Sequence, residues 1–314
     1  MLPDPALLVA AHDDRLRPDG RPGPEWREEL RRIPNARNAL SVVAAWAQVV
    51  VIAWAAVRFD HPIVWVLAIV LMGRMHAVFA ALMHEAAHRL LFSSKRWNDA
   101  VGRWLVGFPS FTPIDGYRRG HMAHHRQEFG PDEPDVPLYR GYPITRASLR
   151  RKLWRDATGR TGWKLFLGLV RAVRSPNAPT RRLALNIIGC QLVLQGICIA
   201  VGHPWLWLLL WFVPYLTVWR VINRLRSIAE HGGMQASPDR RNTTHSVRQH
   251  VLARSFLVPH CIGFHLAHHV DSGVPMRHLP RYHRALVESG YVQPGLEYPN
   301  YPALWRALSA RPAA

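Results

Sequence analysis

The sequence is short of cysteine and of acidic residues. Its 314 residues include 3 cysteines, and 21 aspartates and glutamates stand against 40 lysines and arginines. Three cysteines do not make a disulfide framework, and they cannot supply the four thiolates of a common iron–sulfur cluster. The G-x-G-x-x-G fingerprint of dinucleotide-binding folds is also missing from the sequence. Neither a disulfide-stapled domain nor a dinucleotide site is therefore expected.

The shortage of acidic residues leaves a formal net charge of +19. Such a charge can indicate nucleic-acid binding, but no recognised nucleic-acid-binding motif is present, so we expect no nucleic-acid partner. The basic residues instead alternate with long apolar runs. That arrangement is what the positive-inside rule describes for membrane proteins.

The first segment, residues 1–38, is polar and basic, with proline and glycine as far as Pro24. A secretory signal peptide is not expected, because no apolar core follows a short basic start. The pattern predicts a loose N-terminal arm with a short basic helix around residues 25–32, on the cytoplasmic side.

Apolar runs close to the roughly 20 residues that a bilayer core demands occur four times. The runs are residues 40–57, 63–83, 183–201 and 205–222. Short turns at 58–62 and 202–204 join them into two hairpins. Residues 140–182 are dense in arginine and lysine, which places this segment and both termini in the cytoplasm.

The predicted fold is therefore an all-α integral membrane protein, multi-pass and formed as a single domain over 1–314. Four transmembrane helices in two hairpins carry a cytoplasmic helical cap made of residues 84–182 and 223–314. The apolar segment 105–113 is too short to span and is predicted to be re-entrant or interfacial. His76, inside the second run, is expected to pack or hydrogen-bond rather than to bind a metal.

Histidine clusters are the most informative pattern in the chain. Three boxes and an isolated E-H-G triplet together offer nine imidazoles: His84, His88, His121, His124, His125, His231, His265, His268 and His269. On a helix, positions i, i+3 and i+4 share a face, so each box can aim its imidazoles at one point. Imidazole suits iron, zinc and copper, and no cysteine cluster competes for the metal. Nine nitrogens could fill most of the coordination positions of two metal ions.

One H-x-x-x-H box, two H-x-x-H-H boxes and the intervening E-H-G resemble the membrane fatty acid desaturase superfamily, from about residue 64 to about residue 286. The resemblance implies two iron ions ligated by the nine histidines, with dioxygen as co-substrate. Zinc could replace iron on overexpression.

Two further residues are candidates for supporting the metal ligands. Glu85 could orient an imidazole by accepting its other N–H, or it could be an ordinary helix glutamate. Ser227 stands one turn before His231, where acyl-CoA desaturases of this superfamily have an asparagine that contacts a metal through water. This departure predicts a different environment around one metal.

Two other classes of protein compete with this interpretation. His84-Glu85-Ala86-Ala87-His88 also matches H-E-x-x-H, in which two histidines bind zinc and the glutamate is the general base of a metalloprotease. A protease leaves the other two boxes without a role, whereas the desaturase uses all three. A histidine-rich metal transporter would need ligands through the membrane midplane, whereas these boxes cluster at one predicted membrane face.

The resemblance implies dioxygen-dependent desaturation of a lipid acyl chain, with a hydroxylase or ketolase of the same superfamily as the alternative. Electrons must come from an external donor of ferredoxin, rubredoxin or cytochrome type, because the chain carries no recognisable redox domain. The run His121–Arg126 and the later Asp135-Val136-Pro137 favour sphingolipid-type desaturases. The last box opens with His265 rather than glutamine, which argues against front-end desaturases with a fused cytochrome domain.

Overall fold

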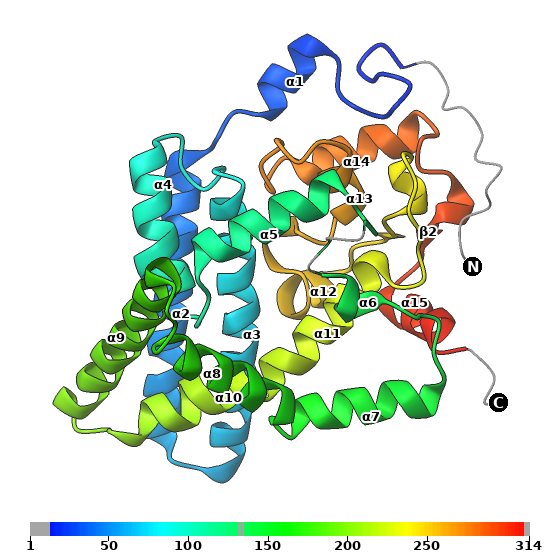
Figure 1. Ribbon diagram of the computed structural model, residues 1–314. Coiled ribbons are helices and arrows are strands. Elements are labelled where there is room, and N and C mark those ends of the chain that lie inside the picture. The colour runs from blue at the N-terminus through cyan, green and yellow to red at the C-terminus, as the bar shows by residue number, and fades with distance from the viewer. Residues whose placement is uncertain (1–12, 131–132, 134, 311–314) are drawn as a thin grey trace. The chain divides into compact units, whose positions relative to one another are not determined.

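The computed structural model describes residues 13–130, 133 and 135–310 and is mostly helical (Figure 1). The chain forms two compact units. We call Pro34–Tyr117 with Arg150–Asn223 the hairpin unit, and the described parts of Met1–Ile33, Arg118–Leu149 and Arg224–Ala314 the histidine unit.

The hairpin unit contains long apolar helices. Its elements are α2 (Asn35–Phe59), α3 (Pro62–Ala87), α4 (Lys95–Val101), the π-helical η1 (Gly102–Gly107), α8 (Arg160–Ala172), α9 (Ala178–Ala200), the π-helical η2 (Trp207–Phe212) and α10 (Val213–Leu216). Three more helices contribute residues to both units: α5 (Ile114–Arg126), α7 (Arg146–Ala157) and α11 (Val218–His231).

The first hairpin turns as the sequence predicts. Asp60 takes a left-handed conformation with φ 38°, and its carboxylate accepts a hydrogen bond from the Trp65 indole N–H at 3.0 Å. His61 caps the next helix by accepting from the Ile63 N–H at 3.3 Å. Pro62 occupies the first position of α3, where a missing N–H costs nothing. Helices α2 and α3 consequently lie side by side (Figure 1).

Within the described residues, three stretches are long and apolar enough to cross a membrane: Pro24–Phe59, Pro62–Ala87 and Ala178–Ala200. They contain the first two predicted spans and most of the third. The fourth predicted span, 205–222, is divided among η2, α10 and α11, with Thr217 at non-helical φ −115° and ψ −85°. Pro214 also lacks the N–H that a continuous helix would need there. A continuous fourth span is therefore not confirmed.

The short segment predicted to be re-entrant is irregular after η1, and helix side chains satisfy its carbonyl groups. Gln191 donates to the carbonyls of Phe108 and Pro109 at 2.8 and 3.0 Å. The Trp211 indole donates to Pro109 at 2.8 Å, and the Trp46 indole to Leu105 at 2.9 Å. Irregular backbone at membrane depth is tolerated only where protein groups satisfy it in this way.

The two polar residues inside the second apolar run have protein partners. Arg74 donates to the Gln48 side chain at 2.6 Å. His76 Nε2 lies 3.0 Å from the Trp211 carbonyl, and its ring packs against the Trp211 ring at 4.4 Å between centroids. The predicted packing role of His76 is thus confirmed.

The histidine unit is built from short helices and one small parallel strand pair. Its elements are α1 (Pro24–Leu30), α6 (Val136–Tyr139), the 3₁₀ turn η3 (Arg240–Asn242), β1 (Ser246–Val247), α12 (Val251–Phe256), η4 (Pro259–Cys261), α13 (His265–Val270), α14 (Leu279–Glu288), η5 (Pro294–Leu296), β2 (Glu297–Tyr298) and α15 (Tyr301–Leu308).

The predicted N-terminal helix is present as α1, and the described part of the arm, from residue 13 on, is not loose. Residues 1–12 of the predicted arm lie outside the described residues. Arg27 and Arg31 donate to the buried carboxylate of Asp271 at 2.7 and 2.5 Å. The Leu30 carbonyl accepts a hydrogen bond from His278 Nδ1 at 2.6 Å. Burial alone would raise the pKa of Asp271, but the hydrogen bonds from the two arginines hold it below its ordinary value. The ionised carboxylate therefore ties the arm to the end of α13, a long-range pairing that the local pattern of residues 1–38 could not show.

Candidate metal centre

The third histidine box forms α13, a helix of six residues that are all buried. Because α13 is helical, His265, His268 and His269 occupy positions i, i+3 and i+4 and share one face. His124 and His125 lie near the end of α5, and His231 is the last residue of α11.

Four of these histidines form a closed group within the histidine unit. The ligand atoms of His124, His231, His265 and His269 all lie within 4.8 Å of one another, and all four residues are buried. His265 Nε2 is 3.1 Å from His231 Nε2 and 3.0 Å from His269 Nε2. Two nitrogens bound at about 2.1 Å and at right angles around one metal lie roughly 3.0 Å apart. These two distances match neighbouring ligands of one metal ion, and the four-histidine group could hold such an ion.

The other ring nitrogen is held by an acceptor in three of the four members. His124 Nδ1 lies 2.5 Å from Glu133 Oε1, His231 Nδ1 lies 2.8 Å from the Thr243 carbonyl, and His269 Nδ1 contacts Glu128. When Nδ1 carries the proton and donates it to such an acceptor, the Nε2 lone pair is free for a metal. His265 differs, since its Nδ1 is 3.7 Å from Glu230.

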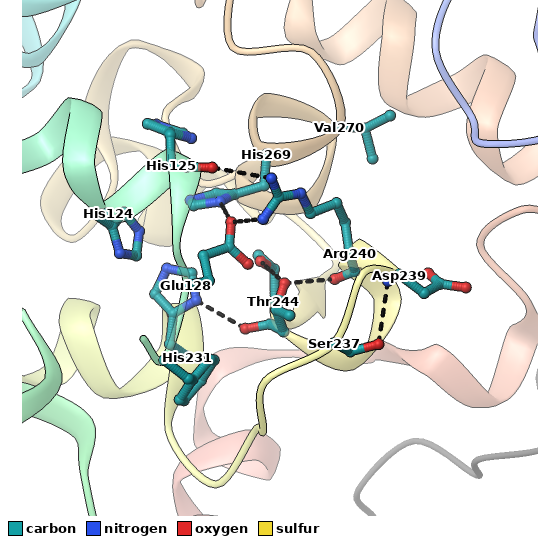
Figure 2. Close-up of polar contacts among 12 residues, drawn as sticks. His124, His125, Glu128, His231, Ser237, Asp239, Arg240, Thr244, His269 and Val270 are labelled. Atoms are coloured by element: carbon teal, nitrogen blue, oxygen red, sulfur yellow. Dashed lines mark hydrogen bonds and ion pairs between the residues drawn. The ribbon is translucent and has the colours of Figure 1, made fainter. Parts of the chain in front are cut away.

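Glu128 is itself held in place by an arginine. Arg240 Nη1 lies 2.6 Å from Glu128 Oε1, and Arg240 Nη2 donates to the His125 carbonyl at 2.9 Å. Figure 2 shows the Glu128 carboxylate between the His269 ring and the Arg240 guanidinium. Burial raises the pKa of Glu128, and the charge of Arg240 opposes that rise.

Burial also sets the charge state of the imidazoles. It holds the pKa of His231, His265 and His269 well below the ordinary value of 6.5. For His124 burial acts in the same direction, but the hydrogen bond and charge of Glu133 outweigh it and raise the pKa. Neutral imidazole is the form that binds metal, so three of the four ligand candidates are already in that form at neutral pH.

Three further histidines gather beside the four-histidine group. His125 Nε2 is 3.2 Å from His121 Nε2 and 3.0 Å from His268 Nε2. The structure thus brings seven of the nine predicted ligands together within the histidine unit. The two remaining histidines, His84 and His88, belong to the hairpin unit at the end of α3, with ring centroids 4.7 Å apart.

The two predicted supporting residues are both buried. Glu85 lies between His84 and His88 in the last turn of α3, and Ser227 lies one turn before His231 on α11. Sequence reasoning missed four contributors to the site: Glu128, Glu133, Arg240 and Thr243. Glu128 could have been suspected from the sequence, because it follows His125 by three residues, just after α5 ends at Arg126. Thr243 contributes a backbone carbonyl, which no side-chain motif can reveal.

Long apolar helices and a buried four-histidine group define the class of this molecule: a helical protein with helices of membrane-spanning length and a site able to hold a metal ion. Comparison with known proteins then gives the family. The fatty acid desaturase family model matches residues 60–298, and the chain belongs to that family.

Two curated relatives support the assignment. The chain is 26% identical over 225 residues to dihydrorhizobitoxine desaturase of Bradyrhizobium elkanii, a match that covers 67% of this chain and 64% of that protein. It is 30% identical over 115 residues to the probable fatty acid desaturase DES1 of Sorghum bicolor, covering 37% of this chain and 28% of that protein. The matched stretches thus span less than two thirds of each relative's length.

Proposed function

We propose that this protein is a dioxygen-dependent desaturase that removes two hydrogens from a lipid acyl chain. The observation that carries the proposal is the buried group of His124, His231, His265 and His269, formed from the family's second and third boxes and the E-H-G triplet. A metalloprotease built on H-E-x-x-H would give this group no role, so the observation favours the desaturase.

The proposed cofactor is a pair of iron ions held by all nine histidines. The four-histidine group fits one ion by its spacing, and His121, His125 and His268 supply ligands for a second. His84 and His88 are included as proposed ligands because they form the first histidine box of the family motif in the sequence. When bound, two iron ions and dioxygen supply the oxidising power that unactivated methylene C–H bonds require and that side chains lack.

The chain's own residues orient and protect the site. Glu128, Glu133 and the Thr243 carbonyl fix the tautomer and orientation of three ligand rings. Burial of these rings excludes bulk water from them. We propose that Glu85 orients an imidazole of the first box and that Ser227 shapes the environment of one metal. Both roles follow from their positions beside ligand residues.

The electron balance requires a partner. Forming one C=C bond releases two electrons and two protons from the substrate, and reduction of dioxygen to two waters takes four electrons and four protons. Two electrons must therefore come from an external donor of ferredoxin, rubredoxin or cytochrome type, and two protons from solvent. The substrate class is part of the proposal, since one relative is named for dihydrorhizobitoxine and the other for a fatty acid.

The test is lipid analysis of a host that expresses the chain with candidate donors. We expect a lipid two mass units lighter than its precursor, absent from cells that carry the His265→Ala variant. A product sixteen units heavier would instead identify a hydroxylase. No altered lipid with any donor, together with peptide cleavage that Glu85→Gln abolishes, would contradict the proposal and favour the protease.

We further propose that the histidine boxes and both termini lie in the cytoplasm, at the inner membrane if the source is bacterial. The distribution of arginine supports this orientation. Reporter fusions after Arg58 and Gly202 should report the outer side, and fusions after Gly130 and at the C-terminus the inner side. The C-terminal fusion is decisive for the fourth span, because the chain is interrupted at Thr217. An outer location for any histidine box would refute the proposed topology.

A further inference from the structure

A basic cavity of about 750 Å³ opens in the histidine unit beside the metal ligands. Seven arginines line it, together with His125 and His269 and a single acidic residue, Asp271. Its walls come from the N-terminal arm, from α5, from η3 and from the end of α13. The docked arm is therefore part of this site.

The arginines are far in excess of the carboxylates that face them. Arg27 and Arg31 share Asp271, and Arg240 pairs with Glu128. Arg21 lies 3.7 Å from Asp19. Set against these three carboxylates, the seven arginines leave an excess of four positive charges.

Two arginines on α5 extend this charge to the surface. Arg119 and Arg126 are both exposed and lie seven residues apart, which puts them on the same face of the helix. Such a concentration of one sign of charge steers oppositely charged partners and speeds their association.

Most of the residues that line the cavity are charged, which suits a charged partner better than an uncharged acyl chain. Apolar side chains are few, with Met122 and Val270 as examples. The imidazoles of His125 and His269, in contrast, are both candidate metal ligands. A redox partner docked over the mouth of the cavity would lie close to these two histidines, and electron transfer weakens steeply with distance.

We propose that this arginine cavity is the docking site of an acidic electron-donor protein, which contacts Arg119 and Arg126 and delivers electrons past His125 and His269. The inference rests on the proposed function, which requires two external electrons per turnover. Beyond that function, the inference specifies the place where the donor binds and the ionic nature of the contact.

Binding can be measured without turnover, which separates this proposal from the proposed reaction. Surface plasmon resonance of the detergent-solubilised full chain would use three acidic probes: a [2Fe–2S] ferredoxin, a rubredoxin and a cytochrome b5. We expect at least one probe to bind with an affinity that falls as salt rises from low to physiological ionic strength. The Arg119→Glu/Arg126→Glu double variant should bind that probe about tenfold more weakly or worse.

The matched control is Arg284→Glu/Arg306→Glu. These arginines are also exposed, on α14 and α15, but do not line the cavity, so binding should change by less than about twofold. Metal content should equal that of the unmodified chain in both double variants. If the bound donor also supports turnover, the cavity variant should raise its KM and leave activity with a chemical reductant unchanged.

Three results would overturn the proposal. One is that none of the probes binds, and another is that both double variants bind the donor equally well. The third is a cavity variant that keeps donor binding but loses binding to phosphatidylglycerol vesicles, which would assign the arginines to lipid headgroups. Failure to find a lipid product would refute the proposed reaction and leave a positive binding result standing.

Discussion

Replacing His231 with alanine is expected to remove about one of the two iron ions of the proposed centre and to reduce dioxygen-dependent turnover to background. His231 supplies one of four nitrogens in a group whose ligand atoms lie within 4.8 Å of one another. Its ring cannot be replaced by water alone without loss of affinity, because imidazole is the stronger ligand for iron. Metal analysis of anaerobically purified protein, with iron and zinc counted separately, gives the measurement.

His283 offers a matched control for this experiment. It is a buried histidine whose Nε2 lies 2.9 Å from Glu297, much as His124 pairs with Glu133, but it belongs to neither metal-binding group. His283→Ala should keep the full metal content. A protein that carries one metal ion, with the same amount in the His231→Ala variant, would contradict the dinuclear centre.

Glu128→Gln should lower metal affinity by roughly 10–100-fold, the usual effect of removing a carboxylate that orients a metal-binding histidine. The substitution keeps the size of the side chain but removes the charge that faces both His269 and Arg240. The His269 ring then faces a neutral amide oxygen, a weaker acceptor than the carboxylate that favours a free Nε2, and Arg240 loses its counterion. Competition with a chelator of known affinity, followed by metal analysis, measures the change.

Glu297→Gln is the corresponding control, since Glu297 accepts from His283 away from the metal-binding groups. Its metal affinity should stay within about twofold of the original, because surface and remote carboxylates contribute little to such sites. Equal chelator resistance in the Glu128→Gln variant and the unmodified chain would show that Glu128 does not support the ligand.

The sequence was a good guide where the physical cause is local. Long apolar runs must be helices if they cross a membrane, so α2, α3 and α9 could be predicted. The i, i+3, i+4 spacing of a box defines a helix face whatever the rest of the chain does. For the same reason the hairpin turn around Asp60 was predictable from residues 58–62.

It was a poor guide where the cause is a contact between distant segments. The arm was predicted to be loose because its residues are polar, whereas contacts with Asp271 and His278, more than 200 residues away in the sequence, dock its described part. The interruption at Thr217 was missed because the run 205–222 is largely apolar, with Arg220 as its one charged residue, and hydropathy says nothing about helix continuity. Pro214 was the available signal.

By itself the sequence determined the ligand type, the number of candidate histidines and the class of helix that carries them, since each depends on residue identity and short-range periodicity. Tertiary structure decided which imidazoles lie close enough together to share a metal and what holds their other nitrogens. His124, His231, His265 and His269 come from three helices, and their grouping follows from the way those helices pack. The supporting carboxylates and the Thr243 carbonyl likewise acquire a role only because folding buries them beside neutral imidazoles, where an unsatisfied N–H would be costly.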